Sequence, residues 1–263
     1  ANSDVWINGF HLGKRPNGYA SFEYELTGHL NFGGKKNVIA VRADNTIQPA
    51  SRYYTGAGIY RHVRMSITNP VHVAHWENFV TATNVTVAKA TITVQTKIMN
   101  QFATAQNVLM QINIISPDGK IVGKTEVKKK LDGNATQTIT QNITVDNPAL
   151  WDVEHPQLYT AVTKIVADKK LIDEVTTLFG IREIKFDAST GFSLNGKQVK
   201  IKGVCLHHDA GALGAAVPLQ AWVRRLQILK ELGVNGIRTS HNAVAPEFLD
   251  LCDKMGFLVM DET

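Results

Sequence analysis

Cysteine is scarce in this sequence of 263 residues, in which only Cys205 and Cys252 occur. Each lies in an apolar stretch and the two form no paired spacing, so a disulfide framework is not indicated. No apolar run approaches the roughly 18 residues that span a bilayer, which predicts a soluble protein with no membrane partner. Hydrophobic residues make up 44% and charged residues 19% of the chain, as is typical of globular proteins.

The excess of positive charge is small and dispersed. The net charge is +5, and the lysine clusters fall in turns or strand ends of separate segments. We therefore expect no nucleic-acid partner. The first residue is Ala rather than Met and a strand-like run follows almost at once, so we expect the beginning to be cut and leave the compartment open.

The first part of the sequence carries strand patterns of period two. Apolar runs at Val5–Ile7 and Phe10–Leu12 surround Asn8-Gly9, a dipeptide suited to the positive φ angles of a tight turn, which predicts a β-hairpin. Alternation then predicts further strands of an all-β layer, at Phe22 to Leu26, residues 38–41 and Val63 to Ile67.

A second series of strands follows a break at Asn69-Pro70. Period-two patterning returns at Val71, with turns at Pro117-Asp118-Gly119 and Asp132-Gly133. This regular spacing predicts a second β-sandwich. Its alternating apolar positions are Ala90, Ile92, Val94, Val108, Met110, Ile112 and Ile114.

After Gly180 the pattern changes to alternating strands and helices. Strands are predicted at residues 199–204, 234–239 and 257–260. Pro218 opens and Gly233 closes one predicted helix, and Pro246 opens a second. The β-α-β-α-β order predicts the beginning of a parallel α/β domain, within which we expect the chain to stop. The helical stripe expected to face the strands contains Trp222, Leu226 and Leu229.

Polar side chains follow all three of these predicted strands. Reactive groups of parallel α/β domains gather at the carboxyl ends of the strands, because the loops there converge on one face. A single His after a strand is more often structural, but polar side chains at the ends of three successive strands favour a functional site. The polar residues at these three strand ends are His207, His208 and Asp209, then Arg238, Ser240, His241 and Asn242, and then Asp261 and Glu262.

Other kinds of site fit these residues less well. A metal site is a minority interpretation, because His207 and His208 point to opposite sides of a strand. A triad of Ser240, His241 and Asp209 lacks the glycines of a nucleophile elbow. A nucleophilic Cys205 would face an apolar strand environment.

Several motifs resemble those of glycoside hydrolase family 2, over essentially the whole chain. Val5–Gly9 and Gly58–Arg61 resemble its jelly-roll sugar-binding domain, Asn147–Trp151 its immunoglobulin-like domain, and Phe179–Arg182 its entry into the TIM barrel. The resemblance implies a multidomain, mainly β fold. Its parts would be a partial jelly-roll β-sandwich over residues 1–69, an immunoglobulin-like β-sandwich over 70–180, and the first β-α-β-α-β portion of a TIM (β/α)8 barrel over 181–263.

Within the predicted barrel, the resemblance implies roles for individual side chains. Lys202–His207 resembles the first-strand motif, whose final His contacts the substrate and stabilises the transition state. Ile237–His241 resembles the second-strand motif, whose Arg supports the active-site carboxylates and whose His binds sugar hydroxyls. Asp261-Glu262 resembles the end of the third strand, which helps to build the pocket. The predicted substrate-binding residues are His207, Asp209, Arg238, His241, Asn242, Glu262 and, in the jelly-roll loop, Arg52.

The family's chemistry implies an exo-acting retaining β-glycosidase of the β-galactosidase type. One Glu protonates the leaving oxygen and a second, about 5 Å away, forms the glycosyl-enzyme. No carboxylate in this sequence matches either motif, so we assign no catalytic residue and expect the chain alone to be inactive. We expect a carbohydrate substrate and no cofactor in this chain, and leave a divalent metal in the parent enzyme and a homo-oligomer open.

Departures from the best-known bacterial β-galactosidases leave the sugar open. Cys205 and Leu206 replace a polar pair, and Ser51–Tyr54 stands where those enzymes place an acidic sugar contact. Arg52 could face an acidic sugar or form a structural salt bridge. The alternatives are a β-glucuronidase or β-mannosidase of the same family, a non-catalytic carbohydrate-binding module, and a metal-dependent α/β hydrolase.

Overall fold

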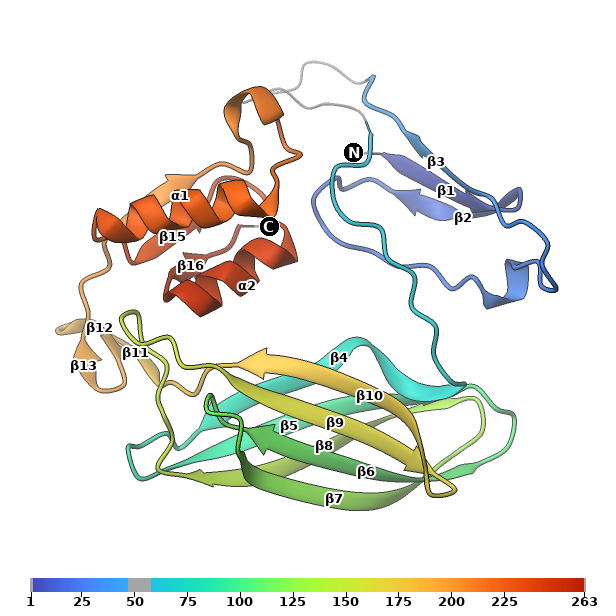
Figure 1. Cartoon of the computed structure of the whole chain (residues 1–263), viewed down its shortest axis with the longest axis horizontal. Coiled ribbons are helices and arrows are strands. Elements are labelled where there is room, and N and C mark those ends of the chain that lie inside the picture. The colour runs from blue at the N-terminus through green and yellow to red at the C-terminus, as the bar shows by residue number, and fades with distance from the viewer. Residues whose placement is uncertain (1, 47–57, 263) are drawn as a thin grey trace. The chain divides into compact units, whose positions relative to one another are not determined.

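A computed structural model describes residues 2–46 and 58–262 (Figure 1). The chain divides into two compact units. Unit 1 contains residues 1–64, 203–251 and 259–263, and unit 2 contains residues 65–202 and 252–258. None of the helices in the described part of the chain has the length and apolar character needed to cross a bilayer.

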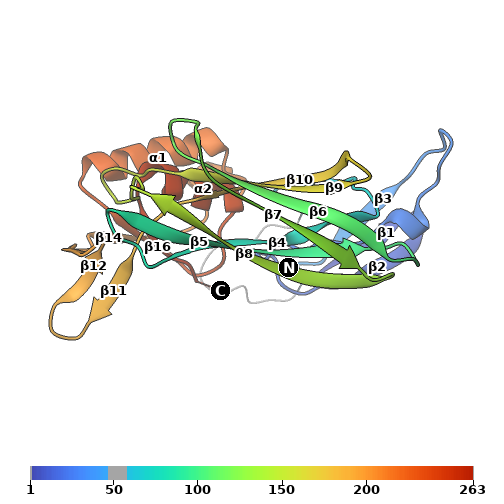
Figure 2. The same ribbon diagram turned by 90° about the horizontal axis from the view of Figure 1, so that it is seen from below.

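Most of unit 2 is an antiparallel β-sandwich (Figure 1, Figure 2). One sheet has the order β4-β5-β8, with β4 at Val71–Thr83, β5 at Lys89–Asn100 and β8 at Ala135–Asp146. The other has the order β10-β9-β6-β7. Its strands are β6 at Gln106–Ile115, β7 at Ile121–Leu131, β9 at Tyr159–Ala167 and β10 at Lys170–Phe179.

The core of this sandwich follows from the period-two pattern of its strands. Successive side chains of a strand point to opposite faces, so one set of alternate residues enters the space between the sheets. The alternating positions predicted from the sequence are all buried, which confirms the second sandwich. They are Ala90, Ile92, Val94, Val108, Met110, Ile112 and Ile114, each at most 3% exposed.

Short hairpin strands follow the sandwich in unit 2. They are β11 at Ile184–Asp187, β12 at Gly191–Leu194 and β13 at Lys197–Gln198. Trp151 lies in a small core here with Val153 and Leu194, and its indole Nε1 donates to the main-chain oxygen of Asp253, 2.8 Å away. The guanidinium of Arg182 covers the indole face at 4.6 Å from the ring centroid.

The N-terminal part of unit 1 contains a three-stranded sheet of order β2-β1-β3. Its strands are β1 at Ser3–Ile7, β2 at Phe10–Arg15 and β3 at Ile39–Ala43, and a short 3-10 helix, η1, covers Thr27–His29. The predicted hairpin is confirmed, because Asn8 and Gly9 adopt φ angles of 51° and 86° between β1 and β2.

Two of the strands predicted for this region do not form. Residues 22–26 and 63–67 are not strands, and Val63 and Ile67 are 72% and 84% exposed. A strand needs a hydrogen-bonded neighbour, and among the described residues neither segment is paired into a sheet. The apolar alternation at these positions is therefore not sufficient for a strand.

The C-terminal part forms the predicted β-α-β-α-β run. Its sheet has the order β14-β15-β16, with strands at Gly203–Leu206, Gly236–Thr239 and Leu258–Met260, and β14 pairs with β15 in parallel. A 3-10 helix, η2, covers Gly211–Leu213. Helix α1 spans Leu219–Glu231 and α2 spans Pro246–Met255, so both predicted helix starts are confirmed.

These strands begin later than the sequence predicts, for local reasons. The amide of Val199 donates to the carbonyl of Phe192 at 3.0 Å, which ties residue 199 to the preceding hairpin. The amide of Val234 donates to the carbonyl of Leu229 at 3.0 Å, at the end of α1. Both valines thus use their amides outside the parallel sheet.

The stripe predicted on α1 is present. Trp222 and Leu226 are buried at 7% and 0% exposure, whereas Leu229 is only partly buried. The indole of Trp222 meets the ring of Phe248 on α2 edge-on, with centroids 4.9 Å apart. The domain ranges 1–69, 70–180 and 181–263 stay a prediction.

Candidate functional site

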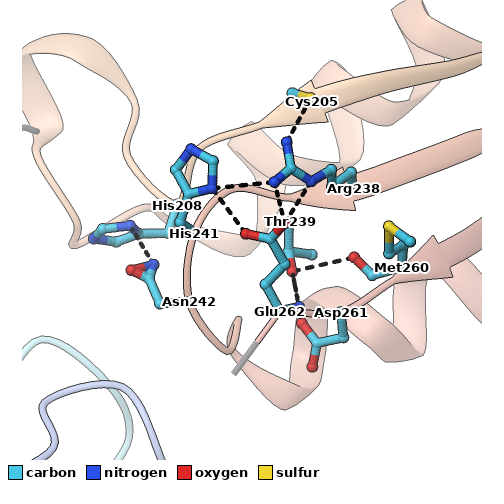
Figure 3. A network of polar contacts seen from close by, with 9 residues as sticks. All are labelled: Cys205, His208, Arg238, Thr239, His241, Asn242, Met260, Asp261 and Glu262. Atoms are coloured by element: carbon cyan, nitrogen blue, oxygen red, sulfur yellow. Dashed lines mark hydrogen bonds and ion pairs between the residues drawn. The ribbon is translucent and has the colours of Figure 1, made fainter.

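A polar cluster lies where β15 and β16 end, with Arg238 and Glu262 at its centre (Figure 3). The guanidinium of Arg238 donates to carboxylate oxygen Oε1 of Glu262, and both Nε and Nη2 contact this oxygen. The other oxygen, Oε2, lies 2.8 Å from Nδ1 of His241. One carboxylate is therefore the shared acceptor for a guanidinium and an imidazole.

This arrangement selects one tautomer of His241. Nη2 of Arg238 lies 3.4 Å from the same Nδ1 and could only donate to it, whereas the carboxylate of Glu262 can only accept and lies closer, at 2.8 Å, so the carboxylate decides that Nδ1 carries the proton. Nδ1 of His241 donates to Glu262, and Nε2 is left for another partner. An imidazole held in this way presents a defined nitrogen to a polar ligand.

The pKa of Glu262 reflects these contacts. Desolvation alone would raise the pKa of this carboxyl, but hydrogen bonds from His241 and Arg238 outweigh it and lower the pKa below its usual value. The pKa of Arg238 is raised, by its contacts with Cys205 and with Glu262. Both groups are consequently charged over the whole neutral range.

Thr239, the last residue of β15, holds the segment that carries Glu262. Its hydroxyl Oγ1 donates to Oδ1 of Asp261 at 2.8 Å and accepts from the amide of Glu262 at 2.9 Å. Thr239 is 1% exposed. Sequence reasoning missed this residue, although a hydroxyl at the end of a parallel strand is a signal that could have indicated it.

The environment of the Cys205 thiol differs from the one predicted for it. Cys205 is exposed, and its sulfur lies 3.6 Å from Nη1 of Arg238, so it does not face an apolar strand environment (Figure 3). Contacts with Arg238 and then Ser240 lower the pKa of the thiol. The reason is register: Cys205 on β14 lies opposite Arg238 on the parallel neighbour β15.

The two histidines after β14 lie in different surroundings. His208 is 9% exposed, its Nδ1 lies 3.1 Å from the amide nitrogen Nδ2 of Asn242, and burial lowers its pKa. His207 is exposed, and its ring meets that of His241 edge-on with centroids 5.8 Å apart. The alternation predicted for this pair is therefore present, and His207 lies on the same side as His241.

The predicted site residues are thus only partly gathered. Arg238, His241 and Glu262 are in direct contact, His207 adjoins His241, and Asn242 contacts the neighbouring His208. The carbonyl of Asp209 accepts from Arg225 of α1 at 3.0 Å. Arg52 lies outside the described residues. Within the described ranges, no three His, Cys, Asp or Glu side chains are grouped so as to hold a metal ion.

Family models match most of the chain. Residues 71–182 match the model for glycosyl hydrolases family 2, and residues 186–263 match the model for the TIM barrel domain of that family. The chain belongs to glycosyl hydrolase family 2. The mainly β fold class is confirmed with it, because the sandwich and the β-α-β-α-β run are those of the family's structures.

Relatives from this family resemble nearly the whole chain. A β-galactosidase, BoGH2A, from Bacteroides ovatus is 49% identical over 99% of this chain, and a β-glucuronidase from Formosa agariphila is 31% identical over 98%. The crystal structure of a family 2 member from Bacteroides cellulosilyticus superposes with a TM-score of 0.96 at 39% identity, over 100% of this chain and 36% of that one. The chain spans 31% and 28% of the length of the two curated relatives.

Proposed function

We propose that this chain supplies sugar-positioning residues to an exo-acting retaining β-glycosidase that hydrolyses terminal β-galactosides. The observation that carries the proposal is the cluster in which Glu262 accepts from Arg238 and His241 at the ends of neighbouring strands. The ring of His241 is already fixed through Nδ1, with Nε2 left for a ligand, as a preorganised site for a polar ligand requires. The 49% identity to a β-galactosidase supports the choice of sugar.

In this proposal the imidazoles act on sugar hydroxyls. Glu262 fixes His241 through Nδ1, so Nε2 is the atom that meets the sugar, and His207 contributes a second ring from the loop after β14. Hydrogen bonds to the sugar strengthen as the ring flattens toward an oxocarbenium-like transition state. Arg238 keeps Glu262 charged, which in turn keeps His241 in its donor orientation.

The bond-breaking step requires two further groups. A retaining glycosidase uses a proton donor and a nucleophilic carboxylate about 5 Å apart on opposite sides of the scissile bond. No carboxylate of this sequence matches either motif, and Glu262 is engaged by Arg238 and His241. We therefore assign positioning and binding to this chain, and no covalent step.

The test is a comparison of nitrophenyl glycosides with the complete protein that contains this sequence. We expect the highest kcat/KM for the β-galactoside, with the β-glucuronide and the β-mannoside at least roughly tenfold lower, a difference of about 1.4 kcal/mol. A preference for the β-glucuronide would favour the second candidate, which the relative from Formosa agariphila supports. Binding of galactose without any turnover would instead favour a carbohydrate-binding module.

A further inference from the structure

Arg61, the last residue of the segment Gly58–Arg61, forms hydrogen bonds to two parts of unit 1 that lie far from it in sequence. Nη1 of Arg61 donates to the main-chain oxygen of Tyr19, and Nη2 donates to that of Ala243, 2.8 Å away and 182 positions further along the chain. A guanidinium offers donors in a fixed planar fork, so it can hold two carbonyls in one geometry. Arg61 therefore links an N-terminal loop to the loop that follows β15.

The second of these carbonyls adjoins the residues proposed to position the sugar. Ala243 is separated from His241 only by Asn242, which is 5% exposed and contacts His208. Fixing the carbonyl of Ala243 restricts the backbone from which the imidazole of His241 extends. Small displacements of a positioning group are costly, since about 1 Å can lower a rate roughly 100-fold.

The same segment also reaches the loop after β14. The hydroxyl of Tyr60 donates to the carbonyl of Gly18 at 2.9 Å, next to Tyr19. The ring of Tyr19 meets His208 edge-on at 5.3 Å, and the ring of Tyr60 lies 6.5 Å from it. Both tyrosines are partly buried, and their rings and the side-chain amide of Asn242 all lie next to His208.

A neighbouring arginine provides the contrast. Arg64 bonds to Glu247 on α2 at 2.6 Å, and both it and His62, which also contacts Glu247, are more than two-thirds exposed. This is an ion pair on the surface of a helix. Arg64 thus shares the charge and the sequence neighbourhood of Arg61, but its partner is a side chain on α2 rather than the backbone of the loop that carries His241.

We propose that Arg61 is a positioning residue for the sugar site, acting through the loop of His241 and Asn242. The inference rests on the proposed glycosidase function and extends it to one side chain outside the barrel strands. Arg61 touches no substrate in this proposal. Its contribution is to keep the backbone at Ala243 and the rings around His208 in place.

The experiment is a double-mutant cycle in the complete protein, with kcat and KM measured on nitrophenyl β-galactoside. Arg61→Ala should lower kcat/KM roughly 10- to 100-fold in the presence of His241. In a His241→Ala background the same substitution should cost less than about threefold, because residues that act through one another are not additive. Arg61→Lys should give an intermediate loss, since an ammonium lacks the planar fork.

Arg64→Ala is the matched control and should leave kcat/KM within about twofold of the parent, as expected for an exposed ion pair. Thermal unfolding of every variant checks the fold, and Arg61→Lys serves if Arg61→Ala does not fold. Equal losses from the Arg61 substitution in both backgrounds, or an Arg61 variant that behaves like Arg64→Ala, would overturn the inference. A parent protein without turnover on any glycoside would instead overturn the proposed function.

Discussion

At the residue scale, the contacts of Glu262 show how one side chain organises its neighbours. Its two carboxylate oxygens face different partners, Arg238 and His241, and its amide is held by Thr239. Because Arg238 and Thr239 hold Glu262 in place, its carboxylate orients the imidazole of His241 more strictly than a carboxylate without these contacts would. The motif resemblance identified Arg238 and His241, but the sharing of one acceptor is visible only in the structure.

Replacing either histidine in the complete protein should reduce catalysis more than binding. Under the proposed function, His207→Ala and His241→Ala each remove a hydrogen bond to the sugar that strengthens in the transition state, worth on the order of 2 to 4 kcal/mol if comparable to other preorganised hydrogen bonds. We expect kcat to fall by a larger factor than KM rises. Steady-state kinetics on nitrophenyl β-galactoside measure both, and unchanged rates in both variants would contradict the assigned roles.

The two cysteines should differ in reactivity toward alkylation. Cys205 is exposed and Arg238 lowers its pKa, whereas burial raises the pKa of Cys252 to about 12. Since the thiolate is the reactive form, iodoacetamide near pH 8 should modify Cys205 at least roughly tenfold faster. Peptide mass spectrometry of this chain against time measures the two rates.

Cys205→Ser is the control for this experiment and should abolish the fast phase. Unfolding the chain in urea at the same pH should narrow the difference between the two thiols, because Cys252 then loses the burial that raises its pKa. Equal rates at pH 8 would show that the arginine does not activate Cys205.

At the scale of elements, close backbone approach decides where the sandwich tolerates a side chain. Gly133 lies in the turn between β7 and β8. A Cβ added to it would lie 2.1 Å from the carbonyl oxygen of Ala103. That neighbour is backbone and not a flexible side-chain end, so the loop itself would have to move. The glycine is needed here for space and not for a positive φ angle.

Gly133→Ala should therefore destabilise the sandwich by about 1 to 3 kcal/mol, the usual cost of overpacking. Urea unfolding followed by circular dichroism would show a lower midpoint. Gly28→Ala is the control, because nothing lies within 4 Å of the position that its Cβ would take, and its effect should stay within about 0.5 kcal/mol. Equal midpoints for the two variants would refute the steric argument.

At the scale of the whole molecule, the chain combines a complete sandwich with only β14, β15 and β16 of a parallel sheet among its described residues. The side chains proposed to position the sugar come without a carboxylate at either catalytic motif. The chain spans 31% and 28% of the length of the two curated relatives, so each is more than three times as long. Binding and bond cleavage are therefore expected to separate in experiments on this chain alone.

The purified chain should show no measurable turnover of nitrophenyl β-galactoside, while the complete protein that contains it does. Retaining hydrolysis needs both a proton donor and a nucleophile, and positioning residues cannot substitute for them. The assay compares the two proteins at equal molar concentration. Robust turnover by the chain, retained after repurification, would refute the assignment of its residues to positioning.

For the sandwich and for the C-terminal β-α-β-α-β run, the sequence by itself determined the kinds of element and their order. Period two at Ala90, Ile92 and Val94 indicated a strand, and the stripe of Trp222 and Leu226 between Pro218 and Gly233 indicated a helix. These are local properties, because side-chain direction repeats every two residues in a strand and every 3.6 in a helix. The family motifs likewise named Arg238 and His241 from short stretches of sequence.

Only the tertiary structure decided which groups meet. It left residues 22–26 and 63–67 outside the sheets of the described part of the chain, placed Cys205 beside Arg238, and brought Arg61 to the carbonyl of Ala243. Hydrogen-bond partners far apart in sequence depend on strand register and on the path of loops, which no local periodicity encodes. The physical reason is that a strand needs a hydrogen-bonded partner strand and a polar site needs groups from several segments, and only folding brings those segments together.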